Sequence, residues 1–156
     1  MTTAPADVLV GIAEKEAAEV LALGSRIALS AGQVLFSLGD AAHSLYVVER
    51  GRIALTLPMT VRDKEQDVLI EERSPGQSLG WSALVPPNRF TLKATAAVDT
   101  EVVALSRAAL FDHFAAHPGA GYAVMRNLSA VVGHRLQVMQ AMWLREVQRV
   151  VEISRA

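Results

Sequence analysis

A glycine-rich turn followed by an arginine is the part of this sequence with the clearest chemical potential. The turn reads Pro75-Gly76-Gln77-Ser78-Leu79-Gly80-Trp81-Ser82, and Arg89 follows it shortly after Pro86-Pro87. Unpaired backbone N–H groups at the start of a short helix attract anions, and an arginine adds a charge and a planar fork of donors. The pattern therefore predicts a binding site for a small anionic ligand.

The residue types that support catalysis or metal binding do not form a matching pattern. Gly80-Trp81-Ser82 begins like a nucleophile elbow, but that motif places a glycine where this chain has Leu84. His113 and His117 are four residues apart, so on a helix their side chains could bind one metal ion, but no third ligand accompanies them. The strand region contains only His43, which does not fit a cupin-like metal barrel. We expect neither an enzyme nor a metal site.

The composition is that of one domain. The chain has 156 residues, 51% of them hydrophobic, and no cysteine, which excludes thiol catalysis, thiolate metal sites and disulfides. Its formal net charge of -1 lacks the basic excess of a protein that binds nucleic acid through phosphates. Neither a secretory signal nor a membrane-spanning segment is visible. We therefore expect one cytoplasmic domain over 1–156, without direct contact to nucleic acid or membrane.

Changes in sequence texture divide this domain into elements. Good helix formers end at Gly24, short apolar runs cut by Gly, Pro, Asn and Asp follow, and Ser106 can cap a helix after them. The predicted elements are an N-terminal helix over 7–24, strands over 25–106, a short helix over 107–118 and a long helix over 120–154. The spacing of the strands is typical of a sandwich or barrel, and the charged segment 62–67 predicts a solvated hairpin tip. The fold class is mainly β with flanking helices.

The long helix has more apolar surface than one small domain can cover. Its apolar residues recur every three or four positions: Met125, Leu128, Val132, Leu136, Met139, Trp143, Val147 and Val150. A helix of this length overhangs the strands, so the pattern predicts a two-fold homodimer with a coiled-coil-like seam. The alternative is a helix that lies back along its own strands.

The order of elements and three motifs resemble a known family. The motifs are Phe36-Ser37-Leu38-Gly39-Asp40, Leu45-Tyr46-Val47-Val48-Glu49-Arg50-Gly51 and Pro75-Gly76-Gln77-Ser78-Leu79-Gly80, and the match continues through Arg135-Leu136-Gln137-Val138. Together they resemble the cyclic nucleotide-binding domains of the catabolite activator (Crp/Fnr) type. The resemblance implies an antiparallel β-roll or jelly roll (a double-stranded β-helix), with the long helix as the dimerisation helix. It also implies cyclic AMP, cyclic GMP or another phosphate-bearing ligand as effector, and no cofactor.

The resemblance implies a phosphate-binding cassette in the stretch that follows the glycine turn. Its candidate residues are Gly80, Trp81, Ser82, Ala83, Asn88, Arg89, Phe90 and Thr91. Trp81 stands where the family has a ribose-binding glutamate, and an indole N–H can only donate. Trp81 is either a stacking platform for a base or a side chain that fills the pocket. Two registers of the next strand place either Asn88 or Arg89 in the position of the family's arginine.

The resemblance also implies that the long helix contacts the base of the ligand. Where members that bind cyclic AMP have a Thr-Ser pair, this chain has Met139 and Gln140. Gln140 keeps a donor and an acceptor, whereas Met139 offers apolar packing, so recognition of the base would differ. The transcription factors of the family continue into a helix-turn-helix domain, and the resemblance does not bring DNA binding to this chain.

Two functions follow as expectations. The first is a regulatory ligand-sensing module, in which a ligand bridging the cassette and the helix changes the order or angle of that helix. The second is a β-roll that has lost the ligand and serves as a dimerisation or docking module for a separate effector protein.

Overall fold

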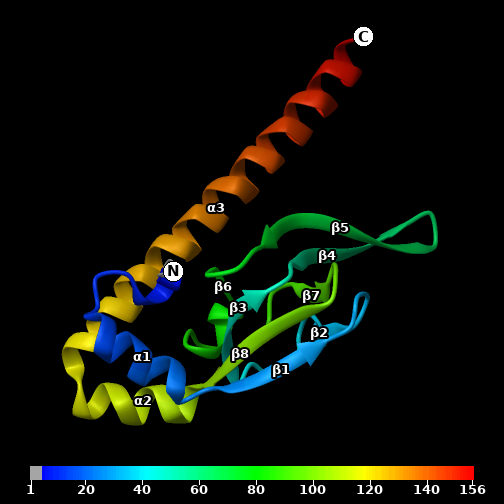
Figure 1. Cartoon of the computed structure of the whole chain (residues 1–156). Helices are drawn as coiled ribbons and strands as arrows, with labels where there is room; N and C mark the ends of the chain where they lie inside the picture. Colours follow the sequence, from blue (N-terminus) through cyan, green and yellow to red (C-terminus); the bar gives the residue numbers. More distant parts are fainter. Residues whose placement is uncertain (1–4) are drawn as a thin grey trace.

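The computed structural model describes residues 5–156 and contains a β-roll of two antiparallel four-stranded sheets (Figure 1). The first sheet has the order β1 (Ser25–Leu29), β8 (Thr100–Ser106), β3 (Ser44–Arg50) and β6 (Ser78–Leu79). The second has the order β2 (Val34–Phe36), β7 (Lys93–Ala96), β4 (Ile53–Val61) and β5 (Lys64–Arg73). The predicted β-roll with flanking helices is confirmed.

Helices lie before and after the roll in the chain, and one short 3-10 turn lies within it, between β6 and β7. They are the 3-10 turn η1 (Asp7–Leu9), α1 (Glu14–Ala22), the 3-10 turn η2 (Trp81–Ala83), α2 (Arg107–Ala116) and α3 (Pro118–Arg155). The expected N-terminal helix over 7–24 is divided in two, because Gly11 takes a φ of +85° that a helix does not allow. His117 separates α2 from α3, since a residue before proline is driven out of the helical region.

The two central strands of the first sheet, β8 and β3, are buried on both faces. Val102 of β8 packs into the roll interior with Phe36, while Val103 and Leu105 pack against the helices. This burial on both sides explains why β8 has a nearly continuous apolar run rather than a strict alternation. The sheet therefore joins two cores, one inside the roll and one under the helices.

The β4–β5 hairpin extends beyond the rest of the roll (Figure 1). Val61 pairs with Lys64, and the two turn residues Arg62 and Asp63 both have positive φ, as a tight hairpin turn requires. The charged segment 62–67 was expected to be the tip as a whole. Only its first two residues form the turn, because the exposed remainder keeps the strand pairing of β5.

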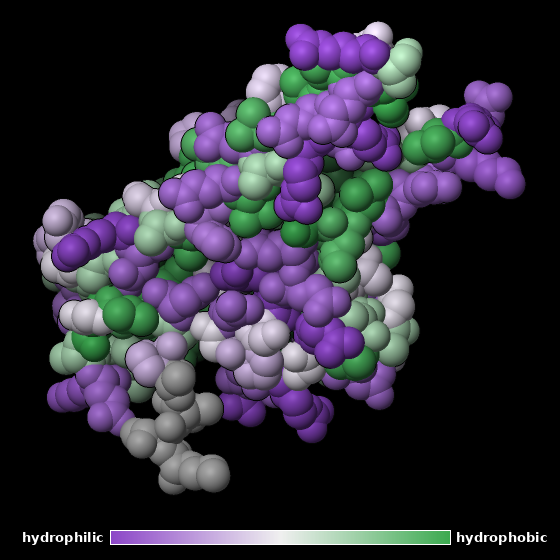
Figure 2. All heavy atoms as spheres, turned by 90° about the horizontal axis from the view of Figure 1, so that it is seen from above, coloured by the Kyte–Doolittle hydropathy of each residue, from purple (hydrophilic) through white to green (hydrophobic). Residues whose placement is uncertain are grey.

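Helix α3 is covered by the domain only over its first half. Its buried residues are Ala120, Gly121, Val124, Leu128 and Arg135, and the part beyond them projects away from the roll (Figure 1). Seen from above, apolar residues remain visible among hydrophilic ones (Figure 2). No helix within residues 5–156 has the length and apolar character that a membrane span needs.

Candidate functional site

The glycine turn of the cassette is held closely between strand β3 and the roll interior. Gly80 has a φ of +79°, and a Cβ there would meet the backbone oxygen of Ser44 at 3.2 Å and the ring of Phe90 at 3.3 Å. The positive φ therefore favours glycine, and a Cβ would require its neighbours to shift by a few tenths of an ångström. After Gly80 the chain forms η2, in which Ser82 and Ala83 are buried.

Asn88 and Arg89 have separate roles, and neither side chain enters the roll. Asn88 has a φ of +60°, and its Nδ2 donates to the backbone oxygens of Ser82 and Ala83 at 3.0 and 3.1 Å. It therefore closes the cassette turn. Arg89 is exposed, and its Nη1 donates to the backbone oxygen of Gly39 at 2.9 Å.

The side chain that enters the roll from the cassette is Phe90. It is 6% exposed and lies flat against Phe36, with ring centroids 3.6 Å apart and planes at 8°. The ring of Tyr46 follows at 5.9 Å from that of Phe36, and burial raises the pKa of the Tyr46 hydroxyl. The alternation from Phe90 through Leu92 points one face inward, since both residues are buried while Thr91 between them is exposed.

The rings of Phe36 and Phe90 line a hollow at the cassette that has almost no free space. The remaining hollow is about 10 Å³, and its lining residues are Phe36, Leu55, Gly80, Trp81, Ser82, Phe90, Thr91, Leu92 and Arg135. Such a volume is at the limit for one water molecule. Trp81 is half-buried at the edge of this hollow and also packs against the core under the helices.

From α3, it is Arg135 that reaches the cassette hollow. Its side chain is 10% exposed, and its Nε donates to Oε2 of Glu71 on β5 at 2.7 Å. Met139, one turn further along α3, is half-buried, and Gln140 is exposed. The two residues that the resemblance assigns to the base therefore lie further along α3 than Arg135, and neither lines the cassette hollow.

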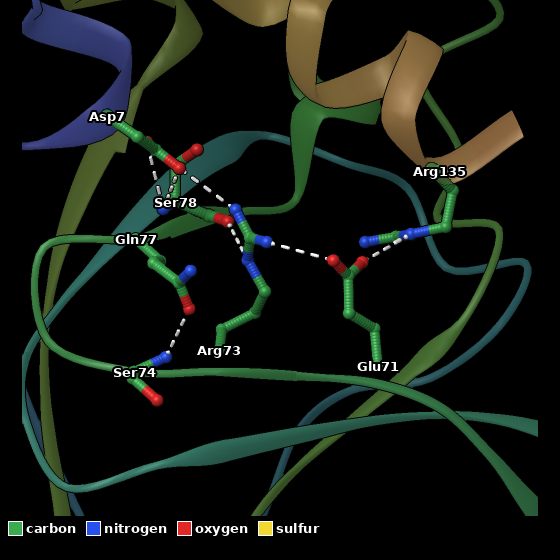
Figure 3. Close-up of polar contacts among 7 residues, drawn as sticks. All are labelled: Asp7, Glu71, Arg73, Ser74, Gln77, Ser78 and Arg135. Carbon is green, nitrogen blue, oxygen red and sulfur yellow. Dashed lines mark hydrogen bonds and ion pairs between the residues drawn. The ribbon is translucent and has the colours of Figure 1, made fainter. Parts of the chain in front are cut away.

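Glu71 belongs to a chain of charged residues that the sequence analysis did not identify (Figure 3). Arg73 donates from Nη1 to Glu71 at 3.1 Å and from Nη2 to Asp7 at 2.9 Å. One signal was present in the sequence: Glu71 and Arg73 are two apart in a strand, so their side chains share a face. Nothing in the sequence indicates that Asp7 and Arg135 would meet them.

His113 of α2 and His117, which follows the end of that helix, stack on each other. The ring centroids of His113 and His117 are 4.4 Å apart, and Nδ1 of His117 lies 3.9 Å from Oε1 of Glu16. Over the part of the chain that the structure describes, no group of three or more metal-ligating side chains gathers.

Comparison with known proteins places this fold in one family. Residues 26–117 match the model of the cyclic nucleotide-binding domain. The catabolite activator protein of Thermus thermophilus superposes with a TM-score of 0.74 at 25% identity, over 91% of this chain and 63% of that one. The N-terminal domain of a transcriptional regulator from Streptomyces coelicolor A3(2) gives a TM-score of 0.69 at 24% identity, over 82% of this chain and 89% of that domain.

One curated protein, much longer than this chain, contains a region with a similar sequence. The protein named glutaminase 2 of Bradyrhizobium diazoefficiens is 27% identical over 128 residues, which is 81% of this chain. The chain spans 19% of the length of that relative. The matched residues 26–117 cover the strands of the roll and α2, which is more than half of the chain. The chain belongs to the cyclic nucleotide-binding domain family, whose members are generally non-catalytic regulatory and sensor domains.

Proposed function

We propose that residues 1–156 act as one non-catalytic regulatory module, which fills its ligand pocket with its own side chains and acts by pairing with a second copy through α3. The observation that carries the proposal is the stacking of Phe90 on Phe36 inside the roll. A pocket for a small organic ligand usually has about 300 Å³ or more. The hollow of about 10 Å³ at the cassette is far below that size.

The arrangement of charge supports the same proposal. The arginine of the cassette, Arg89, lies outside the roll, and its guanidinium is engaged with Gly39. Inside, the cation nearest the hollow is Arg135, and its charge is already balanced by Glu71. An anion at the cassette would therefore have to displace an aromatic ring and compete with a carboxylate.

Pairing through α3 is supported by the apolar stripe on its projecting half. Leu136, Trp143 and Val150 are 58%, 66% and 61% exposed, and they lie on one face of the helix. The stripe from Val132 to Val150 is about 27 Å long at 1.5 Å per residue. Exposed apolar stripes of this kind are usually interfaces, and a second copy of the same helix offers a matching stripe under two-fold symmetry.

A second candidate function is the sensing of a phosphate-bearing ligand, with a cyclic nucleotide as the first choice. Ser82, Thr91 and Arg135 supply polar groups around the cassette hollow. In this function the side chain of Phe90 leaves the roll to admit the ligand. The signal would then pass along α3 to a separate effector protein, and the base would meet Met139 and Gln140.

The two functions predict different effects of an added nucleotide on the melting temperature of the protein. We expect cyclic AMP, cyclic GMP and cyclic dinucleotides at 1 mM to leave the melting temperature unchanged, because a ligand stabilises a fold only if it binds the folded state; a ligand present at about 100 times its Kd would add ~2.7 kcal/mol. Differential scanning fluorimetry measures the shift. A stabilisation that disappears in Arg89→Ala or Arg135→Met would instead support sensing.

Substitution of Phe90, with substitution of the neighbouring Arg89 as its control, tests whether Phe90 fills the roll. We expect Phe90→Ala to lower the free energy of unfolding by about 3–5 kcal/mol, because it leaves a cavity against Phe36. Arg89→Ala removes an exposed side chain and is expected to cost about 0.5 kcal/mol or less. Urea denaturation of both variants measures the difference. Equal losses would show that Phe90 does not pack in the core.

Trp143 tests the pairing of α3. We expect Trp143→Glu to convert a dimer into a monomer in sedimentation velocity at micromolar concentration, because a buried carboxylate without a partner disrupts an apolar seam. Gln148→Glu adds the same charge at an exposed position away from the stripe and is the control, which should remain dimeric. A monomeric wild-type protein under these conditions would contradict the proposal.

A further inference from the structure

Four charged side chains of alternating sign connect three parts of the molecule (Figure 3). They are Asp7 before α1, Arg73 and Glu71 of β5, and Arg135 of α3, and we call them the ion chain. The links are 2.9 Å from Arg73 to Asp7, 3.1 Å from Arg73 to Glu71 and 2.7 Å from Arg135 to Glu71. Two positive and two negative charges leave the set formally neutral.

Three members of the ion chain are more deeply buried than the members of the surface pairs. The side chains of Arg73, Arg135 and Glu71 are 7%, 10% and 17% exposed, whereas the pair Arg149–Glu146 on α3 is 69% and 64% exposed. Exposed pairs contribute little, and a buried charge that loses its partner is costly. The ion chain is therefore where a single lost charge has the largest effect on how the parts fit together.

Further hydrogen bonds fix the inner members in place. Nε of Arg73 donates to the backbone oxygen of Ser78 at 2.7 Å, and the backbone N–H of Ser78 donates to the carboxylate of Asp7 at 3.1 Å. On the other side of the N-terminal segment, Nδ2 of Asn127 donates to the backbone oxygens of Val8 and Val10 at 2.9 and 2.8 Å. The N-terminal segment is thus bonded to the roll through Asp7 and to α3 through Asn127.

The ion chain lies where the roll and the helix meet. Arg135 lines the cassette hollow together with Phe90, so the contact between helix and roll is made beside the closed pocket. Beyond Arg135 the described part of α3 has no buried residue. Arg135 is the last buried residue before the projecting half, so its contact with Glu71 bears on the direction in which that half leaves the domain.

We propose that the ion chain is a built-in latch that sets the direction of α3 relative to the roll without a ligand, with Glu71 and Arg135 as its positioning residues. Charge-assisted hydrogen bonds favour one orientation, because only that arrangement brings each donor to its acceptor. The latch acts within one chain, so this proposal does not depend on the pairing of two copies.

The chain has no cysteine, so two introduced cysteines can carry spin labels at known places. Ser30, in the turn between β1 and β2, and Gln148, on the projecting half of α3, are both exposed. Double electron–electron resonance then measures the distance from roll to helix, with an excess of unlabelled protein to remove distances between copies. Sedimentation of the same samples reports pairing separately, so failure of the dimer proposal leaves this test intact.

We expect Glu71→Gln and Arg135→Met each to broaden and shift the distance distribution, while Glu146→Gln, which breaks the exposed pair, leaves it unchanged. The double variant Glu71→Leu with Arg135→Leu should regain most of the thermal stability lost in the single variants, because no unpaired charge remains between the two positions. Its distance distribution should stay broad, which a purely stabilising role would not produce. A distribution as narrow as the wild type in the double variant, or in both single variants, would overturn the proposal. If the single variants do not fold, the double variant decides.

Discussion

The flat contact between Phe90 and Phe36 governs what the rest of this domain can do. Phe90 follows the cassette turn directly, so its entry into the roll fixes the direction of its neighbours. Arg89 is turned outward to Gly39, and Asn88 is turned back to close the turn with its amide. The residues best suited to hold an anion are thereby removed from the interior, and aromatic surface takes their place.

Because Phe90 and Phe36 occupy the interior, side chains rather than a bound ligand must connect the roll to α3. The ion chain supplies this connection, and it does so next to the closed hollow, where Arg135 is within reach of both Glu71 and the cassette. Its charges cancel, so the connection can be buried without a bound counter-ion. The apolar stripe beyond Arg135 stays exposed, and it is the surface that the proposed pairing with a second copy would use.

Local sequence patterns predict the helices and strands, whereas the geometry of the candidate site depends on contacts between residues far apart in the sequence. The turn signals and short apolar runs over 25–106 predict the roll, and the three- to four-residue period predicts the long helix, because both patterns are local. The inward face of Phe90 also follows from alternation. Its partner Phe36 does not, since the two residues are far apart in the sequence and meet only when β2 pairs with β7.

The difference between local patterns and distant contacts also explains which predictions were wrong and which contacts were missed. The N-terminal helix was predicted too long because good helix formers outweighed Gly11, whose positive φ is required by the path of the chain. The sequence permits two registers for the cassette, with Asn88 or Arg89 toward the ligand, but in the structure neither side chain lines the hollow. The ion chain was missed because its members come from three separate elements, and charge pairs of that kind leave no periodic pattern.

The most direct test of a self-filled roll is a nuclear magnetic resonance measurement on the protein without ligand. We expect cross-relaxation between the ring protons of Phe90 and Phe36, as their contact requires, and no change in these signals when cyclic AMP is added in excess. Ring signals that lack this contact, or that move on addition of the nucleotide as Phe90 leaves the roll, would contradict the account.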